Sequence, residues 1–494
     1  MTDHPHLAKI ALFGTSADVW PVAALLACSL PEQTKLTIVE TSGSGSGTNG
    51  AMVVPAAHRY FERSQIDIAD LLKRSDASVG IGITHLGWLG AGSELFLGPS
   101  GSMPKINGVP LHQIMLRAAM LHDDRRRLAH LLEPFRLPSR AAAAGKLSWP
   151  AGEAGSPKQM LGPQIQIGVA AFAEYLRGRS TRDRFETLQG IASAVATGGE
   201  NTVRSVLLED GREIAADIFI DLSGEISDFA VLEQGTQPKQ SVFEFPFSQL
   251  RSGFIPAAEG QRSFNPAAEA IEGGLIMRTT LPSGTIIEAL VSETGHEAAG
   301  IGNLPASDMT CADFRMFSTA DPWSGNLVRM GTAACALGPY HSADRLLLLE
   351  QALHFAELLP ASANMAAEAQ AYNARQAASF SQVRDRVLAP FLLNHRTDAA
   401  WTACREVDVP GSLRIRMDQF AARGRLVTFE HEITDEQEWI DLFIGFGLIP
   451  DRCDPLALTL DMQKLVPVLG RIASDLGAIV AAMPDHKAPF RAQG

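Results

Sequence analysis

The chain of 494 residues has few cysteines, and no two of them are close together. The five are Cys28, Cys311, Cys335, Cys404 and Cys453. Because none has C-x-x-C spacing, neither a zinc site nor a disulfide framework is indicated, and we expect no metal. The sequence also lacks an apolar run near the roughly 20 residues that a membrane helix needs. Its N-terminus lacks a signal-peptide pattern. We therefore expect a cytoplasmic protein that has no membrane partner.

Basic residues are outnumbered: 42 Lys and Arg stand against 55 Asp and Glu, which gives a formal net charge of −13. A protein with a net negative charge repels the phosphate backbone of nucleic acids, so we expect no nucleic-acid partner. With 46% hydrophobic and 20% charged residues, the composition excludes intrinsic disorder. The length allows about three domains' worth of material in one or two compact units. If the chain self-associates, a homodimer is the expected assembly.

The first forty residues have the pattern strand, turn, helix, strand. An apolar run over 10–13 is followed by a turn at 14–17, and apolar residues then recur at helical spacing over 20–27. A second apolar run at 36–39 ends on Glu40. This order predicts a βαβ unit and an α/β fold of the Rossmann type with a parallel sheet.

The turn after the first strand only partly matches a dinucleotide-binding turn. Such a turn needs three glycines, for the tight turn, for close approach of the backbone to the pyrophosphate and for helix–strand packing. Here these positions hold Gly14, Ser16 and Val19. The Ser16 hydroxyl can still bond a phosphate, whereas the β-branched Val19 crowds the helix–sheet contact. Glu40 stands where an acidic residue takes the ribose hydroxyls. Two interpretations stay open: an occupied nucleotide site, or a Rossmann-type fold whose site has decayed.

The rest of the chain divides into a sheet-rich part and a helical part. A Gly- and Ser-rich loop at 42–50 is either a linker or a loop near the ligand. Further along we expect a helix at 170–177 and a β-meander formed by 203–208 and 218–222. Two more strands are expected at 275–281 and 286–291. From 346 onward the pattern is mainly helical. We predict a nucleotide-binding α/β domain at 1–355, with an interleaved second sheet, and a helical subdomain at 356–494.

Several segments, in their order and spacing, are similar to one known family. They are 10–27 with 38–40, 50–55, 76–88, 172–177, 217–224, 330–334 with Pro339, His395 with Trp401, and Trp439, Pro450, Pro455 and 483–486. On these segments the chain resembles the flavin-dependent tryptophan halogenases over nearly its whole length. The resemblance implies the FAD-binding fold of flavin monooxygenases and halogenases, in which the domain at 1–355 binds FAD and also carries a substrate-side sheet.

The resemblance also implies a cofactor, a reaction and partners. FAD would contact Gly14, Thr15, Ser16, Ala17, Glu40, Gly50, Gly331 and Thr332. In the family, reduced FAD and oxygen form a flavin hydroperoxide, halide attacks it, and hypohalous acid passes through a tunnel to an aromatic, indole-like substrate. An active-site lysine holds or relays the halogenating species, and a glutamate assists at the substrate. A flavin reductase or a halogenase-like protein is the implied protein partner.

The residues that would perform this chemistry are substituted. The family's lysine position falls on Gly80 and its glutamate position on His341, while its W-x-W-x-I-P motif falls on 275–280, which read Leu-Ile-Met-Arg-Thr-Thr. Glycine has neither an amine nor a cation to hold hypohalous acid. We therefore expect a degenerate active site, in a non-catalytic paralogue or subunit whose FAD binding is weak or lost. The alternative is an active FADH2-dependent halogenase or monooxygenase that uses other residues on an aromatic substrate.

Two histidines are the candidates for such a replacement chemistry. His85 and His341 lie in the segments expected to flank the substrate end of the tunnel, where a pair could act as acid and base near neutral pH. The other interpretation is two hydrogen-bonded or partly exposed histidines that share no site. We expect Asp344 and Arg345 to be a helix-start acid and a surface ion pair, and Trp88 to be a packing residue.

Overall fold

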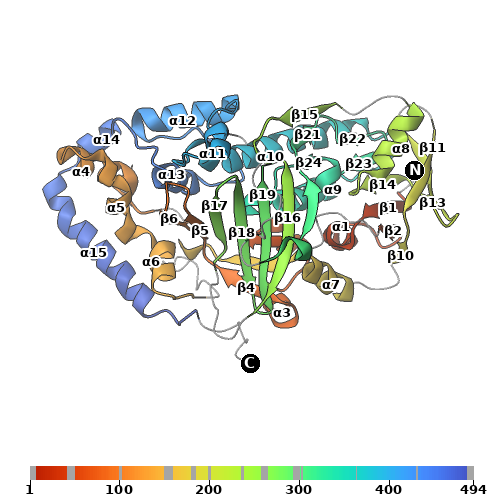
Figure 1. Ribbon diagram of the computed structural model, residues 1–494, viewed down its shortest axis with the longest axis horizontal. Coiled ribbons are helices and arrows are strands. Elements are labelled where there is room, and N and C mark those ends of the chain that lie inside the picture. The colour runs from red at the N-terminus through yellow and green to blue at the C-terminus, as the bar shows by residue number, and fades with distance from the viewer. Residues whose placement is uncertain are drawn as a thin grey trace, which may run out of the picture.

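The chain has an α/β architecture with several sheets, as the sequence predicts (Figure 1). The computed structural model describes residues 7–41, 50–99, 103–148, 160–179, 185–198, 202–234, 239–257, 265–292, 301, 304–362, 364–429 and 432–486. The Gly- and Ser-rich loop lies outside them, apart from Gly50. Of the described helices, none combines the length and the apolar character needed to cross a membrane.

The opening βαβ unit forms at the predicted positions. β1 (Lys9–Gly14) pairs in parallel with β2 (Lys35–Glu40), and α1 (Ser16–Ser29) connects them. In the described part of the chain, this sheet has the order β10-β2-β1-β14-β23-β22. Five successive residues of β1 are buried, as in a strand covered on both faces. The remaining strands are β10 (Phe185–Gln189), β14 (Ile218–Asp221), β22 (Trp323–Ser324) and β23 (Leu327–Arg329).

The predicted β-meander is wrong at its last strand. β12 (Val203–Leu208) does pair with antiparallel neighbours, β11 (Ala192–Thr197) and β13 (Glu213–Ala215). However, β14 leaves them and inserts beside β1, with which it is parallel. All four residues of β14 are buried. An uninterrupted apolar run of this kind is typical of a central parallel strand, so burial on both faces explains the difference.

A large, mostly antiparallel sheet forms the middle of the molecule (Figure 1). Among the described residues its order is β20-β16-β19-β18-β17-β5-β6. The two strands expected near 275–281 and 286–291 are present as β18 and β19, which pair as an antiparallel hairpin. The strands are β5 (Ile83–Leu86), β6 (Glu94–Leu97), β16 (Gln249–Pro256), β17 (Ala267–Ile271), β18 (Gly274–Leu281), β19 (Gly284–Val291) and β20 (Thr310–Asp313).

A smaller sheet carries Gly80, the residue predicted to stand at the family's lysine position. Its strands are β3 (Ala51–Pro55), β9 (Gln164–Gly168) and β4 (Ala77–Gly80), in that order. Gly80 is therefore the last residue of β4, where it pairs with Gln164 of β9. Short ladders complete the sheets: β7 (Lys105–Ile106) with β8 (Val109–Pro110), and β15 (Gln240–Phe243) and β24 (Cys335–Ala336) on either side of β21 (Met316–Thr319).

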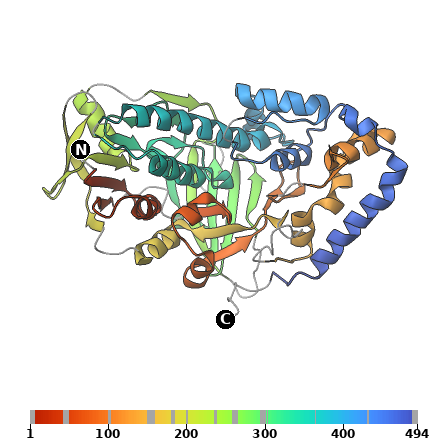
Figure 2. The ribbon, with the colours of Figure 1, turned by 180° about the vertical axis from the view of Figure 1, so that it is seen from behind.

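Helices cover the sheets and build one end of the molecule. The long helices α9 (Ala343–Glu357) and α10 (Ala366–Leu392) run side by side across the large sheet (Figure 2). Near the parallel sheet lie α7 (Val169–Arg179) and α8 (Glu225–Gln234), and near the small sheet α2 (Arg59–Arg63) and α3 (Ile68–Arg74). The far end holds α4 (Leu111–Leu121), α5 (Leu128–Leu132), α6 (Leu137–Ala143), α11 (Ala399–Cys404), α12 (Gly411–Arg423), α13 (Glu436–Gly445), α14 (Pro455–Leu458) and α15 (Met462–Ala481).

The helical end combines segments from both predicted domains. α15 packs against α6, although α6 lies before residue 356. The buried Arg136 side chain, which precedes α6, donates to Asp441 of α13 at 3.0 Å. The expected boundary between 355 and 356 falls in the last turn of α9. The division into 1–355 and 356–494 stays a prediction.

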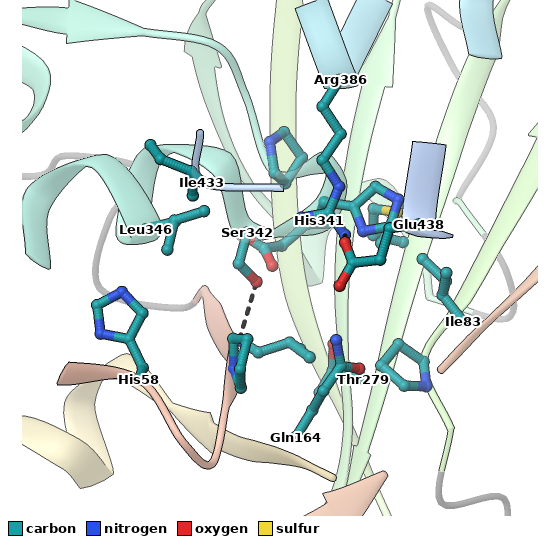
Figure 3. A pocket seen from close by; sticks show the side chains of 16 residues that line it. His58, Ile83, Gln164, Thr279, His341, Ser342, Leu346, Arg386, Ile433 and Glu438 are labelled. Atoms are coloured by element: carbon teal, nitrogen blue, oxygen red, sulfur yellow. Dashed lines mark hydrogen bonds and ion pairs between the residues drawn. The ribbon is translucent and has the colours of Figure 1, made fainter. Parts of the chain in front are cut away.

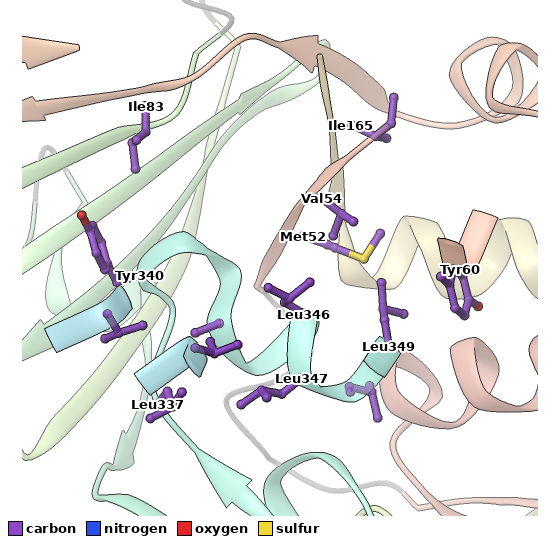
Figure 4. Packing of buried hydrophobic residues seen from close by; sticks show 14 of the residues in the cluster. Met52, Val54, Tyr60, Ile83, Ile165, Leu337, Tyr340, Leu346, Leu347 and Leu349 are labelled. Atoms are coloured by element: carbon purple, nitrogen blue, oxygen red, sulfur yellow. The ribbon is translucent and has the colours of Figure 1, made fainter. Parts of the chain in front are cut away.

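Apolar packing fixes α9 against the small sheet (Figure 4). Leu346 and Leu349 of α9 lie in the same buried cluster as Met52 and Val54 of β3. The hydroxyl of Tyr60 in α2 donates to the Pro21 carbonyl of α1 at 2.7 Å. These contacts connect the parallel sheet to the small one, and they hold the start of α9 beside the cleft described next.

Candidate active site

A cleft of about 470 Å³ lies at the carboxyl ends of the parallel strands. Residues that directly follow four of these strands line it: Thr15 after β1, Thr41 after β2, Leu222 after β14, and the pair Gly331 and Thr332 after β23. Ligands of open α/β sheets bind at this edge. The predicted residues Thr15, Gly331 and Thr332 therefore lie together in one cavity.

The turn into α1 has the geometry of a nucleotide-binding turn only at its first residue. A Cβ atom at Gly14 would lie 2.8 Å from the Cβ of Leu222, so only glycine fits there. Val19 is completely buried and packs in the main core, and Ala17 is buried beside it. The crowding expected from Val19 is thus accommodated by packing. The Ser16 hydroxyl accepts a hydrogen bond from Arg177 of α7 at 2.7 Å.

An ion pair stands at the N-terminus of α1, where the cleft begins. The carboxylate of Asp18 accepts hydrogen bonds from the Thr15 hydroxyl at 2.7 Å and from the Arg345 guanidinium of α9. The Asp18 and Arg345 side chains are only 11% and 17% exposed, and both line the cleft. The expectation of a surface pair formed by Asp344 and Arg345 was therefore wrong. The partner of Arg345 is remote in sequence, so no local pattern indicated it.

Glu40 is already surrounded by hydrogen-bond donors. Its buried carboxylate accepts from the Trp20 indole at 2.6 Å, from Arg177 at 2.5 Å and from the Gln189 amide. The Arg177 guanidinium also lies over the Trp20 ring, 5.4 Å from its centre. Glu40 does not belong to the described lining of the cleft. Its predicted partner, a ribose, would have to displace these donors.

Two further carboxyl groups lie deeper in the cleft. Glu288 of β19 accepts a hydrogen bond from the Ala51 backbone at 3.1 Å, and a Cβ atom at Gly50 would lie 2.8 Å from its Oε1. Burial raises the pKa of Glu288 to about 7. Asp344 accepts from the Leu337 backbone at 2.6 Å, and burial raises its pKa to about 6. Gly50, predicted to contact the cofactor, thus has Glu288 as its immediate neighbour.

A second pocket of about 90 Å³ adjoins the cleft, and Glu288, Pro339 and Ser342 line both (Figure 3). Figure 3 shows Arg386 and His341 opposite Gln164 and Thr279 across this pocket. Arg386 of α10 forms an ion pair with Glu438 of α13 at 3.1 Å. Gly80, which we predicted to stand at the family's lysine position, pairs with Gln164 of the pocket lining and so lies beside this pocket. None of the described residues lining either cavity is a lysine.

The two candidate histidines are neighbours, but they differ in exposure to the pocket. Their ring centres are 6.1 Å apart. His85 is buried, and its Nε2 lies 2.7 Å from the Tyr340 hydroxyl; burial lowers its pKa to about 3. His341 lines the pocket, and its Nε2 has no hydrogen-bond partner among the described residues. Burial, followed by the charge of Arg386, lowers the pKa of His341 well below its usual range. Both imidazoles are therefore neutral at neutral pH.

Trp88 is a packing residue, as predicted. It is 1% exposed and lies against an aromatic cluster that includes Trp401, at 4.8 Å between ring centres, and Phe391, at 5.0 Å.

Sequence reasoning missed Glu288, Arg345, Arg386 and Glu438 as cavity residues. For Glu288 a signal was present, because it is the sole charged residue in the apolar strand 286–291. The arginines and Glu438 lie in ordinary helical patterns that carried no such signal.

The fold and the paired cavities define a class of α/β proteins related to flavin-dependent halogenases. The model of the tryptophan halogenase family matches residues 9–243 and 298–462, more than half of the chain, and the chain belongs to this family. It is 20% identical over 499 residues to tryptophan 7-halogenase RebH of Lentzea aerocolonigenes, covering 90% of this chain and 91% of the relative. The resemblance predicted from the sequence is thereby confirmed.

Solved structures of flavin-dependent halogenases have the same fold. BrvH from Brevundimonas sp. BAL3 matches with a TM-score of 0.86 at 23% identity, covering 98% of each chain. Xcc4156 from Xanthomonas campestris matches with a TM-score of 0.85 at 20% identity, covering 97% of each chain. The predicted fold class is confirmed by these matches.

FAD is the cofactor that the family implies, but the residues at its expected phosphate position do not fit it. A pyrophosphate is stabilised at a helix N-terminus by the free N–H groups and by the helix dipole. The first turn of α1 already carries the Asp18 carboxylate, which lines the cleft and pairs with Arg345. A phosphate there would face a carboxylate and would compete with it for the same guanidinium. We therefore derive no chemical step through FAD.

Proposed function

We propose that this chain is a tryptophan halogenase family protein without standard halogenation activity, a non-catalytic paralogue or subunit that binds FAD weakly or not at all. One observation carries the proposal: the described residues that line the two cavities include no lysine. Gly80, at the family's lysine position, ends β4 beside the pocket and has no side chain to supply. The amine that would hold a halogenating species is therefore missing.

The second substituted position supports the same proposal. His341 stands where the family has its glutamate, and its imidazole is neutral. A neutral imidazole cannot supply the negative charge of a carboxylate, so it is not an equivalent replacement. Arg386 brings a cation to the pocket, but that guanidinium is paired with Glu438 and its charge is fixed. It therefore cannot form a haloamine as an uncharged amine would.

The proposal predicts that purified protein does not halogenate indole. The assay supplies FAD, a flavin reductase, NADH, oxygen and bromide, and it measures brominated indole by mass spectrometry. We also expect the Gly80→Lys variant to stay inactive, because the glutamate and the tryptophan motif are missing as well. Brominated product from the unmodified chain would refute the proposal, whereas product from Gly80→Lys alone would show that one substitution explains the loss.

A titration with oxidised and reduced FAD, followed by the visible spectrum, tests the cofactor part of the proposal. We expect no perturbed flavin band at micromolar FAD. Micromolar binding with a perturbed band would refute the claim of weak or absent binding.

An active enzyme with other residues is the second candidate, and one observation favours it. Glu288, with its raised pKa, lies at the junction of the cleft and the pocket and could exchange a proton near neutral pH. On this alternative the chain is an FADH2-dependent halogenase or monooxygenase that acts on an aromatic, indole-like molecule. A flavin reductase would supply the FADH2. Hydroxylated or halogenated product that disappears in Glu288→Gln would support it.

A partner protein belongs to the first proposal. A non-catalytic subunit would act by binding a competent halogenase-like chain, and co-expression followed by size-exclusion chromatography would detect such a pair. A homodimer is the simplest alternative assembly.

A further inference from the structure

The first turn of α1 carries a buried carboxylate, that of Asp18, at the end of the helix where the dipole favours an anion. Two groups donate hydrogen bonds to this carboxylate: the Thr15 hydroxyl and the Arg345 guanidinium. A helix N-terminus, a hydroxyl and a guanidinium are the donors that recognise a phosphate. The Asp18 side chain is only 11% exposed, so its charge is largely removed from water and acts at short range.

The remaining charges of the cleft also oppose a phosphate. Its described carboxylate side chains are Asp18, Glu225, Glu288, Asp313 and Asp344, and its guanidinium side chains are Arg315 and Arg345. Arg345 is paired with Asp18. Arg315 donates to the Gln240 amide at 2.9 Å and lies over the Phe317 ring, 5.1 Å from its centre. The cations of the described lining are thus already engaged, while acids outnumber them.

Apolar surface in the same cleft suits an aromatic ligand. Leu222 and Leu250 lie on its walls with Phe314 and Phe317, and Leu348 of α9 adds to them. A volume of about 470 Å³ falls within the usual range of small-molecule sites. The cavity therefore keeps room and apolar surface for a planar ring, although its phosphate position is taken.

We infer that Asp18 acts as an internal substitute for a phosphate and makes the cleft select aromatic ligands that carry no phosphate group. The inference rests on the proposed absence of standard FAD binding, and it adds the ligand class. Riboflavin is the natural probe, because FAD consists of riboflavin joined to ADP through a pyrophosphate. The three compounds therefore separate the contribution of the ring from that of the phosphates.

The first experiment compares riboflavin, FAD and ADP on the full-length protein. Quenching of flavin fluorescence gives the dissociation constants of riboflavin and FAD, and calorimetry gives that of ADP. We expect riboflavin to bind at least about tenfold more tightly than FAD, since a phosphate close to Asp18 is repelled across a short, poorly screened distance. ADP should not bind. Equal or tighter binding of FAD, or no binding of riboflavin, would overturn the inference.

The second experiment removes the charge of Asp18. Asp18→Asn removes a carboxylate that repels phosphate and that pairs with Arg345, so ADP and FAD should bind at least about tenfold more tightly than to the unmodified chain. Asp313→Asn is the matched control, because Asp313 is an exposed carboxylate of the same cleft, and among the described residues Arg345 forms its ion pair with Asp18 and not with Asp313. Its effect on ADP should stay below about threefold. Equal gains in both variants would show a general charge effect and overturn the specific role of Asp18.

Thermal unfolding distinguishes a variant that fails to fold from a folded variant that does not gain ADP binding. Asp18→Asn removes the buried ion pair between Asp18 and Arg345, so we expect a lower Tm than that of the unmodified chain. ADP should restore part of this loss in Asp18→Asn and should not shift the Tm of the unmodified chain. An unrestored Tm in a folded variant would contradict the inference. The two claims fail independently. Brominated indole in the halogenation assay would refute the proposed function, but tighter binding of riboflavin than of FAD on the same sample would still support the inference about Asp18.

Discussion

At the scale of single residues, the cleft is distinguished by carboxyl groups held away from water. Glu288 is the clearest case, because burial is the main cause of its raised pKa and the nearby Asp344 adds to it. The Ala51 backbone N–H and the Arg345 guanidinium act in the opposite direction and reduce the shift. The folded chain therefore holds a proton on Glu288 at a pH where the unfolded chain has released it.

This difference makes stability depend on pH. Since the pKa of Glu288 rises from 4.5 to about 7 on folding, its contribution is fully present below about pH 4.5 and is lost as the pH rises through 7. Glu288→Gln has no proton to lose. We therefore expect its unfolding free energy, relative to the unmodified chain, to increase by on the order of 2 kcal/mol between pH 5 and pH 8.

Urea unfolding at pH 5, 6, 7 and 8 measures this change. Glu32→Gln is the control, because Glu32 is exposed in a turn and should give no comparable trend. A constant difference between Glu288→Gln and the unmodified chain across the series would contradict the expected proton uptake.

The residues of the site were predictable to different degrees. Thr15 could be placed because it follows the first predicted strand and ligands bind at the carboxyl ends of parallel strands, whereas Gly331 and Thr332 were indicated only by the family resemblance. Arg345 could not, since its partner Asp18 is 327 residues away in the sequence. Contacts between remote segments depend on the tertiary fold, which residue spacing does not encode.

At the scale of elements, the short turn before α9 contains a strained backbone. His341 and Ser342 have φ values of 55° and 51°, the left-handed region that residues with a Cβ atom rarely occupy. They lie in the single 3-10 turn from Tyr340 to Ser342. The Ser342 hydroxyl accepts a hydrogen bond from the Val53 backbone at 2.9 Å, which holds the turn against β3. Strain of this kind persists where surrounding contacts fix the conformation.

The strain predicts an unusual order of stability at position 341. His341→Gly and His341→Ala both lose the imidazole, but only glycine relieves the positive φ. We expect the glycine variant to be more stable than the alanine variant by about 1 kcal/mol. Urea unfolding of the two variants measures the difference.

Position 352 provides the control for this pair. Ala352 is a buried residue in the middle of α9, so Ala352→Gly should destabilise the protein by at least about 1 kcal/mol. If alanine were also the more stable residue at position 341, the strain assigned to that turn would be wrong.

The elements themselves were predicted best where periodicity was strong. The βαβ unit appears as expected, and so do the two strands β18 and β19, whose pairing as a hairpin was not predicted. The error at β14 has a physical origin: a short apolar run fits an antiparallel meander and a buried parallel strand equally well. The choice between them depends on β1, a partner about two hundred residues earlier.

At the scale of the whole molecule, an aromatic cluster joins the two halves of the chain. Trp401 of α11 stacks on Phe391 of α10, with 5.6 Å between ring centres, and contacts Trp88 and Phe247 from the sheet-rich part. Its indole donates to the Ile271 carbonyl at 2.8 Å. Because both predicted domains contribute to this packing, we expect them to unfold together.

Trp401→Ala tests this cooperativity. Loss of a fully buried ring and of its hydrogen bond should reduce the unfolding free energy by about 3–5 kcal/mol. Trp401→Phe, which keeps most of the ring contact, should lose less. Calorimetry should show one transition for the unmodified chain and for both variants. Two separate transitions, of which Trp401→Ala shifts one, would mean that 1–355 and 356–494 unfold independently.

The ion pair of Asp18 with Arg345 has a consequence for the history of this chain. Asp18 and Arg345 offset each other's charge in a poorly hydrated place, so replacing either one alone lowers stability. If FAD binding is lost, as we propose, single substitutions at this pair would lower stability before a phosphate site could form. The proposed loss would therefore be difficult to reverse one residue at a time.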